Sequence, residues 1–224
     1  MRAVEGLHEE AARLIEQRFP PEVRGRTQVL DLGAGFGAFS LRLKDIGFGS
    51  VEAWDADVEQ FRVEGVEALR MDLDADFADG AGTYDFVVAL EVVEHLENLF
   101  HFMRQVAALL SDGGVLLLST PNVESAVGRV TFLRSGLLRW FGPDDVTVVG
   151  HINPVPGHVL LEAARRAGLR VVGRSSNVPG ALVTVEYGAR ALVKGLIALL
   201  LYPLMTGNRR GDVGIWVMTT EKSQ

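Results

Sequence analysis

Cysteine is absent from this chain of 224 residues. Its absence excludes disulfides, thiolate zinc sites and a cysteine nucleophile, and it suits a reducing compartment. A secretory signal peptide is not expected either, because Glu5, Glu9 and Glu10 interrupt the apolar residues near the N-terminus. We therefore expect a cytoplasmic protein.

A long hydrophobic run is also missing. In the apolar segment 189–207 the uncharged run covers only 13 residues, 195–207, whereas a membrane-spanning helix needs about 20. Two interpretations of this segment stay open: a helix that is buried or forms a homodimer contact, and a helix that lies peripherally at a membrane surface. The cationic residues that flank the run are Arg190, Lys194, Arg209 and Arg210.

Positive charge is scarce in the first half of the chain. Residues 1–120 carry a net charge of −12, and residues 121–224 carry one of +5. A basic second half favours an anionic ligand or an anionic membrane surface, unless its arginines are simply solvated. The overall charge of −7 and the lack of a nucleic-acid-binding module argue against a nucleic acid partner.

The chain is organised around residues 29–39, with the sequence VLDLGAGFGAF. The apolar residues predict a buried strand, and glycines at every second position then open a helix that extends to about residue 46. A dinucleotide-binding fingerprint would be G-x-G-x-x-G, but position 38 is alanine. Asp31 suits a cationic ammonium group, whereas a pyrophosphate favours a helix N-terminus without a nearby carboxylate.

Polar residues follow the next predicted strands, at positions where ligands bind in α/β folds. The second strand, 51–55, ends at Asp55, and a carboxylate there suits both ribose hydroxyls of a nucleotide-like cofactor. Alternatively, Asp55 caps a helix that starts near Ala56. The strands expected at 84–90 and 115–119 lead into two further motifs, E-V-V-E-H at 91–95 and S-T-P-N at 119–122.

With the D-x-G-x-G-x-G run that starts at Asp31, these motifs resemble those of class I S-adenosylmethionine (SAM)-dependent methyltransferases. The similarity is to the ubiquinone-biosynthesis type, with type 11 and type 23 methyltransferase domains, over about residues 25–175 and a final strand near 213–220. It implies a methyltransferase with a single α/β domain over residues 1–224. Its Rossmann-like sheet would have seven strands in the order 3-2-1-4-5-7-6, with strand 7 antiparallel and helices on both faces.

The resemblance also implies SAM as the cofactor, with S-adenosylhomocysteine (SAH) as its product. In this family an aspartate after the third strand contacts the adenine amino group and its neighbour packs on the ring, and Asp72 and Leu73 match these positions. The expected cofactor-binding residues are Asp31, Gly33, Ala34, Gly35, Asp55, Ala56, Asp72, Leu73, Leu90 and Glu91.

Methyl transfer to a hydroxyl requires a positioned acceptor and removal of its proton. We expect O-methylation with His95 and His151 as candidate catalytic bases; the alternative for His95 is a structural role. A metal ion is not expected, but one alternative is kept. Small-RNA 2′-O-methyltransferases hold a divalent metal with an E-x-x-E-H motif and a later histidine. In this chain the residues of the motif would share one face only if residues 91–95 formed a helix. The matching residues are Glu91, Glu94, His95 and His151.

Two insertions relative to a minimal fold are expected near residues 123–150 and 177–210. The first mixes apolar residues with Arg129, Arg134 and Arg139, and it predicts either a lid over the acceptor or an extra helical pair. Arginines in a lid would pair with a phosphate or carboxylate. We therefore expect a small-molecule, lipid-linked or glycan-linked acceptor with an anionic and an apolar part. Two other functions stay open, an NAD-dependent oxidoreductase and a non-catalytic SAM-binding scaffold.

Overall fold

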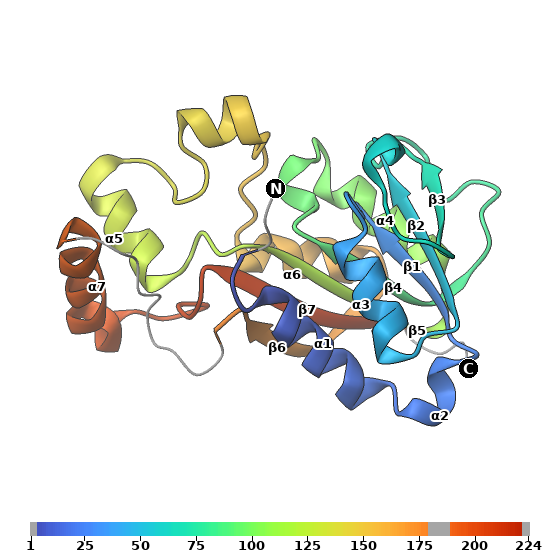
Figure 1. Cartoon of the computed structure of the whole chain (residues 1–224). Coiled ribbons are helices and arrows are strands. Elements are labelled where there is room, and N and C mark those ends of the chain that lie inside the picture. The colour runs from blue at the N-terminus through green and yellow to red at the C-terminus, as the bar shows by residue number, and fades with distance from the viewer. Residues whose placement is uncertain (1–3, 179–188, 221–224) are drawn as a thin grey trace.

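A seven-stranded sheet forms the centre of the protein (Figure 1). The computed structural model describes residues 4–178 and 189–220. The strand order is β3-β2-β1-β4-β5-β7-β6, and β7 alone among these seven runs antiparallel to its neighbours. This confirms the predicted order and the antiparallel last strand. The strands are β1 Gln28–Leu32, β2 Ser50–Asp55, β3 Glu67–Arg70, β4 Tyr84–Leu90, β5 Leu110–Pro121, β6 Leu169–Ser176 and β7 Val213–Thr220.

Helices cover both faces of the sheet, as expected (Figure 1). On one face lie α4 and α6, and on the other lie α1 and α3. The α-helices are α1 Leu7–Arg18, α2 Pro21–Arg24, α3 Ala38–Ile46, α4 Leu99–Leu109, α5 Ala126–Ser135, α6 Gly157–Arg166 and α7 Ala189–Leu201. Shorter turns are η1 Val58–Gln60, η2 Val93–His95, η3 Asp145–Val149 and η4 Tyr202–Leu204.

The strand sequences explain the two layers, because successive side chains of a strand point to opposite faces. Leu30 and Leu116 belong to the buried cluster that includes α4 and α6. Val29 and Leu117 belong to the cluster that includes α1 and α3. Since β1, β2 and β4 are parallel, their carboxyl ends meet at one edge of the sheet, which is where ligands bind in such folds.

Two of the alternatives left open by the sequence required helices that the structure does not form at those places. The segment after Ala56 contains only the three-residue turn η1. Residues 91–95 do not form an α-helix either, because Glu91 has a left-handed backbone with φ of 56° and the turn η2 starts at Val93. Glu91 therefore does not share a helical face with Glu94 and His95.

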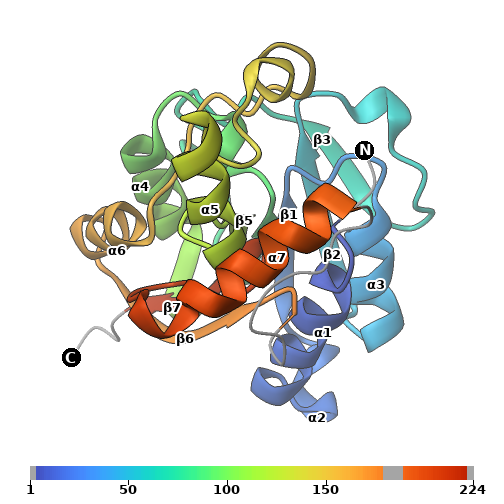
Figure 2. The same ribbon diagram turned by 90° about the vertical axis from the view of Figure 1, so that its left-hand side faces the viewer.

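The two insertions meet each other at one end of the sheet. Figure 2 shows α7 crossing α5, and Val127 and Val130 of α5 pack with Ala198 of α7. The helix that pairs with α5 therefore comes from the second insertion, whereas the alternative for residues 123–150 was a helical pair within the first insertion. Residues 179–188, which belong to the second insertion, lie outside the described residues, as does the side chain of Arg190. Within the described ranges, every helix is too short or too polar to cross a bilayer.

Candidate active site

The glycine loop between β1 and α3 turns sharply at the carboxyl edge of the sheet. Gly33, Gly35 and Gly37 all have left-handed backbones, with φ of 70°, 54° and 88°. A Cβ atom on Gly33 would lie 2.5 Å from Cγ2 of Val92, so a side chain there would collide with the segment after β4. At Gly35, by contrast, a Cβ would meet no described atom within 4 Å. The backbone of this loop is therefore open to a ligand.

Asp31 is a buried carboxylate at the end of β1, with only 2% of its surface exposed. Its Oδ2 accepts a hydrogen bond of 2.5 Å from Oγ of Ser40. Burial raises the pKa of Asp31 to about 7, and the nearby charge of Asp55 adds to this effect. A cationic group beside Asp31 would relieve this cost, because an opposite charge favours the ionised carboxylate.

Asp55 holds the glycine loop against the end of β2. Its Oδ2 accepts from the backbone N–H of Gly35 at 2.8 Å, and its Oδ1 accepts from that of Asp57 at 2.9 Å. The residue whose side chain caps η1 is Asp57, which accepts from the N–H of Glu59. The helix-capping alternative for Asp55 is therefore wrong.

Two glutamates follow β4, the partly buried Glu91 and the buried Glu94, and each is held by a hydroxyl at the end of β5. Oγ of Ser119 donates to Oε1 of Glu91 at 2.9 Å, and Oγ1 of Thr120 donates to Oε2 of Glu94 at 3.1 Å. Burial raises the pKa of Glu91 to about 7. Burial, together with the charge of Glu91, raises the pKa of Glu94 well above its usual value. The S-T-P-N motif therefore positions the E-V-V-E-H motif.

The two candidate catalytic histidines are brought together from distant parts of the chain. The ring centroids of His95 and His151 lie 4.9 Å apart. Nδ1 of His95 lies 3.1 Å from the carbonyl of Gly150, and Nδ1 of His151 lies 2.8 Å from that of Trp140. Burial and the neighbouring His151 lower the pKa of His95. With Glu94 they form a group whose possible ligand atoms lie within 4.8 Å of one another; Glu91 is not part of it.

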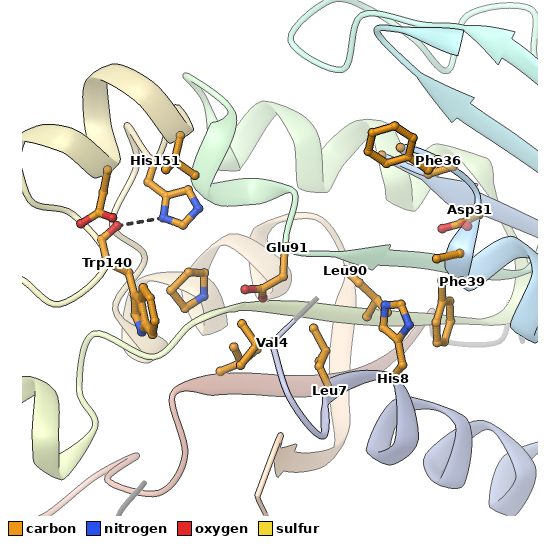
Figure 3. A pocket seen from close by; sticks show the side chains of 18 residues that line it. Val4, Leu7, His8, Asp31, Phe36, Phe39, Leu90, Glu91, Trp140 and His151 are labelled. Carbon is orange, nitrogen blue, oxygen red and sulfur yellow. Dashed lines mark hydrogen bonds between the residues drawn. The ribbon is translucent and has the colours of Figure 1, made fainter. Parts of the chain in front are cut away.

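A cavity of about 470 Å³ extends from Asp31 and the glycine loop to Glu91 and His151 (Figure 3). In Figure 3, Glu91 lies between Asp31 on one side and His151 on the other. Of the predicted site residues, the cavity is lined by Asp31, Gly33, Ala34, Gly35, Leu90, Glu91 and His151. Those that do not line it are Asp55, Ala56, Asp72, Leu73, Glu94 and His95. Asp72 is exposed, and Leu73 is buried in the core beside α4.

Several cavity residues were missed by the sequence analysis. Leu7 and His8 come from α1, and Trp140 and Val149 come from the first insertion. Residues 4–19 have the amphipathic pattern of a helix, and in the resembled family such a helix often covers the cofactor, but the pattern does not show which of its residues border the cavity. Trp140 combines a left-handed backbone, with φ of 69°, with a buried Nε1 that has no hydrogen-bond partner in the described part of the chain.

The arginines of the first insertion were expected to face an anionic acceptor. For Arg139 this is wrong: it is buried, and its Nη2 lies 2.9 Å from Oδ2 of Asp212. Arg129 donates to the backbone carbonyls of Glu124 and Thr206. Arg134 is exposed. At least two of these arginines, Arg129 and Arg139, therefore hold the first insertion in place.

The chain was compared with known proteins. Residues 4–173 match the family model described as a methyltransferase domain, Methyltransf_23. The ubiquinone biosynthesis O-methyltransferase of Caulobacter sp. (strain K31) is 31% identical over 141 residues, which cover 56% of this chain and 56% of that protein. The chain thus spans about half the length of the curated relatives it matches.

Solved structures share the fold across nearly the whole chain. A SAM-dependent methyltransferase from Archaeoglobus fulgidus matches with a TM-score of 0.62 and 17% identity, covering 95% of this chain and 94% of that one. A chain from the complex between the Haloferax volcanii Trm112 methyltransferase activator and the putative methyltransferase matches with a TM-score of 0.65 and 18% identity, covering 97% and 91%. The family match favours a methyltransferase over the NAD-dependent oxidoreductase. Because that match covers more than half of the chain, the protein belongs to the class I SAM-dependent methyltransferase family.

Proposed function

We propose that this protein transfers the methyl group of SAM to a hydroxyl oxygen of an acceptor bound in the same cavity. The observation that carries the proposal is the single cavity that extends from Asp31 and the glycine loop, past Glu91, to His151. Methyl transfer from a sulfonium is an in-line displacement, and the protein contributes mainly by positioning the two reactants and excluding water. A shared, partly enclosed space supports that role.

The proposed cofactor contacts follow from the groups around the glycine loop. Asp31 binds the ammonium group of SAM, and Leu90 and Glu91 border its methionine end. Asp55 accepts hydrogen bonds from the ribose hydroxyls. A carboxylate offers about four acceptor positions, and Asp55 uses one for Gly35 and one for Asp57. For Ala56, Asp72 and Leu73, contact with the adenosine part stays a prediction.

The proposed acceptor hydroxyl faces the histidine pair. His151 lines the cavity, and His95 lies directly behind it. Each histidine directs Nδ1 to a backbone carbonyl, and a carbonyl can only accept. The proton is therefore on Nδ1, and Nε2 is the nitrogen that can promote loss of the hydroxyl proton.

The exposed apolar face of α7 and of the turn η4 that follows it supports an acceptor with a lipid part. Leu196, Leu200 and Leu204 are 58%, 78% and 81% exposed. Contiguous apolar surface of this kind marks contact with a membrane or another protein. We propose that this face lies at a membrane surface, which would bring a lipid-linked acceptor to the cavity.

The cofactor assignment is tested by isothermal titration calorimetry with SAH and with NAD⁺. We expect SAH to bind with one site per chain and NAD⁺ to give no heat of binding, because the site provides a carboxylate where a pyrophosphate would lie. Binding of NAD⁺ alone would reverse the assignment. Methyl transfer itself is followed with isotope-labelled SAM and pools of hydroxylated lipids and small molecules. SAH binding without transfer to any of them would favour the non-catalytic scaffold.

The membrane contact is tested by co-sedimentation with anionic phospholipid vesicles at low salt. Replacing Leu196 and Leu200 with aspartate should reduce the bound fraction at least about tenfold, because each inserted leucine contributes about 1.5–3 kcal/mol. The matched control is Leu41→Asp, at an exposed leucine of α3. If the unmodified protein stays in the supernatant but forms a dimer that the double variant lacks, the face of α7 binds a second copy instead.

A further inference from the structure

We propose that a cationic pocket at the outer edge of the sheet binds a phosphate group. The pocket has a volume of about 340 Å³ and shares no lining residue with the cavity of the candidate active site. It lies between the end of β6, the turn η4 and the loop that leads into β7. The lining residues that bear on the proposal are Arg174, Ser176, Tyr202, Arg209 and Arg210.

The three arginines of this pocket have no counter-ion. None of them forms an ion pair in the described part of the chain, and no carboxylate lines the pocket. Glu10, which accepts from the lining hydroxyl of Ser175, is paired with Arg13. Asp212, in the adjoining loop, faces Arg139. Cations that share a pocket without a neighbouring anion repel one another, so an anion bound there is stabilised.

Two of the guanidinium groups are already fixed in position. Nη1 of Arg209 donates to the carbonyls of Tyr202 and Met205, and its guanidinium lies 4.3 Å from the centre of the Tyr202 ring. Nε of Arg210 donates to the Tyr202 hydroxyl at 3.2 Å. Among the described residues, Nη2 of Arg209 and both Nη atoms of Arg210 have no hydrogen-bond partner. These donors face a ligand at a reduced entropic cost, because the side chains are ordered beforehand.

The loop that carries these two arginines is held by the S-T-P-N motif. Asn122, the last residue of the motif, is 3% exposed and does not line the active-site cavity. Its Nδ2 donates to the carbonyls of Asn208 and Arg210 at 3.1 and 2.9 Å. The N–H of Ala126 donates to the carbonyl of Arg209 at 2.9 Å. The backbone on this side of the pocket is therefore preorganised by buried hydrogen bonds.

Two hydroxyls add neutral donors to the pocket. Ser176 is only 4% exposed, and its Oγ has no hydrogen-bond partner among the residues that the structure describes. The Tyr202 hydroxyl accepts from Arg210 and keeps its own hydrogen to donate. A phosphate monoester presents three terminal oxygens and a charge of about −2, whereas a carboxylate presents two oxygens and one charge. Three guanidiniums with hydroxyl donors therefore favour phosphate over carboxylate.

The surroundings of the pocket favour a phosphate that is carried by a lipid. Tyr202 lines the pocket, and Leu204 of the same turn, η4, is 81% exposed. Acyl chains of a lipid bound by its phosphate would lie beside this leucine and the apolar face of α7. Arg210 precedes the cavity residue Val213 by three residues, so their Cα atoms are at most about 11 Å apart. The lipid source rests on the proposed function, whereas phosphate binding does not.

The test is calorimetry of the full chain with inorganic phosphate, with glycerol 3-phosphate and with short-chain phosphatidic acid below its micelle concentration. We expect one site per chain for each probe and the highest affinity for phosphatidic acid. Arg174→Gln and Arg210→Gln should each weaken binding of all three at least about tenfold, because each removes charge-assisted hydrogen bonds. The matched control is Arg170→Gln, at an exposed arginine near the other end of β6, which should leave binding unchanged.

Leu204→Ser separates the two sources of the phosphate. It should lower the affinity for phosphatidic acid towards that for glycerol 3-phosphate and leave inorganic phosphate binding unchanged. If glycerol 3-phosphate binds the unmodified protein as tightly as phosphatidic acid does, the lipid source is wrong and the ligand is a soluble phosphate ester.

Circular dichroism and thermal unfolding show whether each variant is folded, and Arg174 has no partner among the described residues that its replacement would remove. The proposal is overturned if the unmodified protein binds none of the probes at millimolar concentration. It is also overturned if the folded Arg174→Gln and Arg210→Gln proteins bind them unchanged, or if Arg170→Gln weakens binding equally. A separate SAH titration tests the proposed function, so the two hypotheses can fail independently.

Discussion

Replacing Asp31 with asparagine is expected to weaken SAH binding about 100-fold and, at the same time, to stabilise the free protein. Loss of one partner of a buried charge pair costs about 2–5 kcal/mol of binding free energy, and about 2.7 kcal/mol corresponds to 100-fold. Asparagine keeps the size of the side chain and can still accept from Ser40. The loss therefore reports the missing charge opposite the ammonium group.

The gain in stability follows from the raised pKa of Asp31. In the folded protein this pKa is about 7, above that of an aspartate in the unfolded chain. The folded state therefore binds more protons between these two pKa values, and stability is lost as the pH rises towards 7. At pH 8 the buried charge costs up to about 4 kcal/mol, at about 1.4 kcal/mol per pKa unit. Asparagine removes this cost, so the free energy of unfolding should rise.

The same pKa makes SAH binding dependent on pH. Between pH 8 and pH 6 the affinity of the unmodified protein should fall roughly tenfold, because Asp31 goes from mostly ionised to mostly protonated. Burial lowers the pKa of the cavity residue His8, so this residue stays neutral over most of the range. Any pH dependence left in Asp31→Asn would come from Glu91, whose pKa is also about 7.

Calorimetry at several pH values and chemical unfolding at pH 8 measure these effects. The matched control is Asp79→Asn, at an exposed aspartate of the loop between β3 and β4, which should change neither quantity. Unchanged SAH affinity in a folded Asp31→Asn protein would show that Asp31 does not face the ammonium group. A large loss of stability would show that the carboxylate is needed by the fold.

Replacing Arg139 with methionine is expected to lower the free energy of unfolding by about 3–5 kcal/mol, because it removes the guanidinium that faces the buried carboxylate of Asp212. Both residues are at least nine-tenths buried. Asp212 also joins the start of β7 to the end of β5, since its carbonyl accepts from the N–H of Asn122 at 2.7 Å. The pair therefore anchors the insertion that carries Trp140 onto the sheet.

Thermal and chemical unfolding measure this effect, and a midpoint lower by about 10 °C is expected for a chain of this size. Glu162→Gln is the control, because its pairs with Arg165 and Arg166 are exposed and such pairs contribute little. Adding Asp212→Asn to Arg139→Met should recover part of the loss, because it removes the buried negative charge that Arg139 faces. A single variant as stable as the unmodified protein would contradict a structural role for this ion pair.

The sequence by itself determined the position of the glycine loop, which depends on local features: an apolar strand and the alternating glycines after Asp31. The sheet order came from the resemblance that the motifs show to class I methyltransferases, and the structure confirms it. The left-handed backbones of Gly33, Gly35 and Gly37 agree with their residue type, because glycine adopts this conformation without a steric cost. Where the local pattern was ambiguous, at Ala56 and at Glu91, the structure rules out the helices that the two less favoured alternatives required.

Only the tertiary structure decided which polar residues meet. A helix over the E-V-V-E-H motif would have placed Glu91 and His95 on one face, but Glu91 has a left-handed backbone and its side chain accepts from Ser119. The insertion brings His151 beside His95, and it buries Arg139 against Asp212. Contacts between residues so far apart, and the desolvation that shifts the pKa of Asp31, depend on how the whole chain packs. A local sequence pattern contains neither distance nor burial, so these features of the site became visible only in the folded protein.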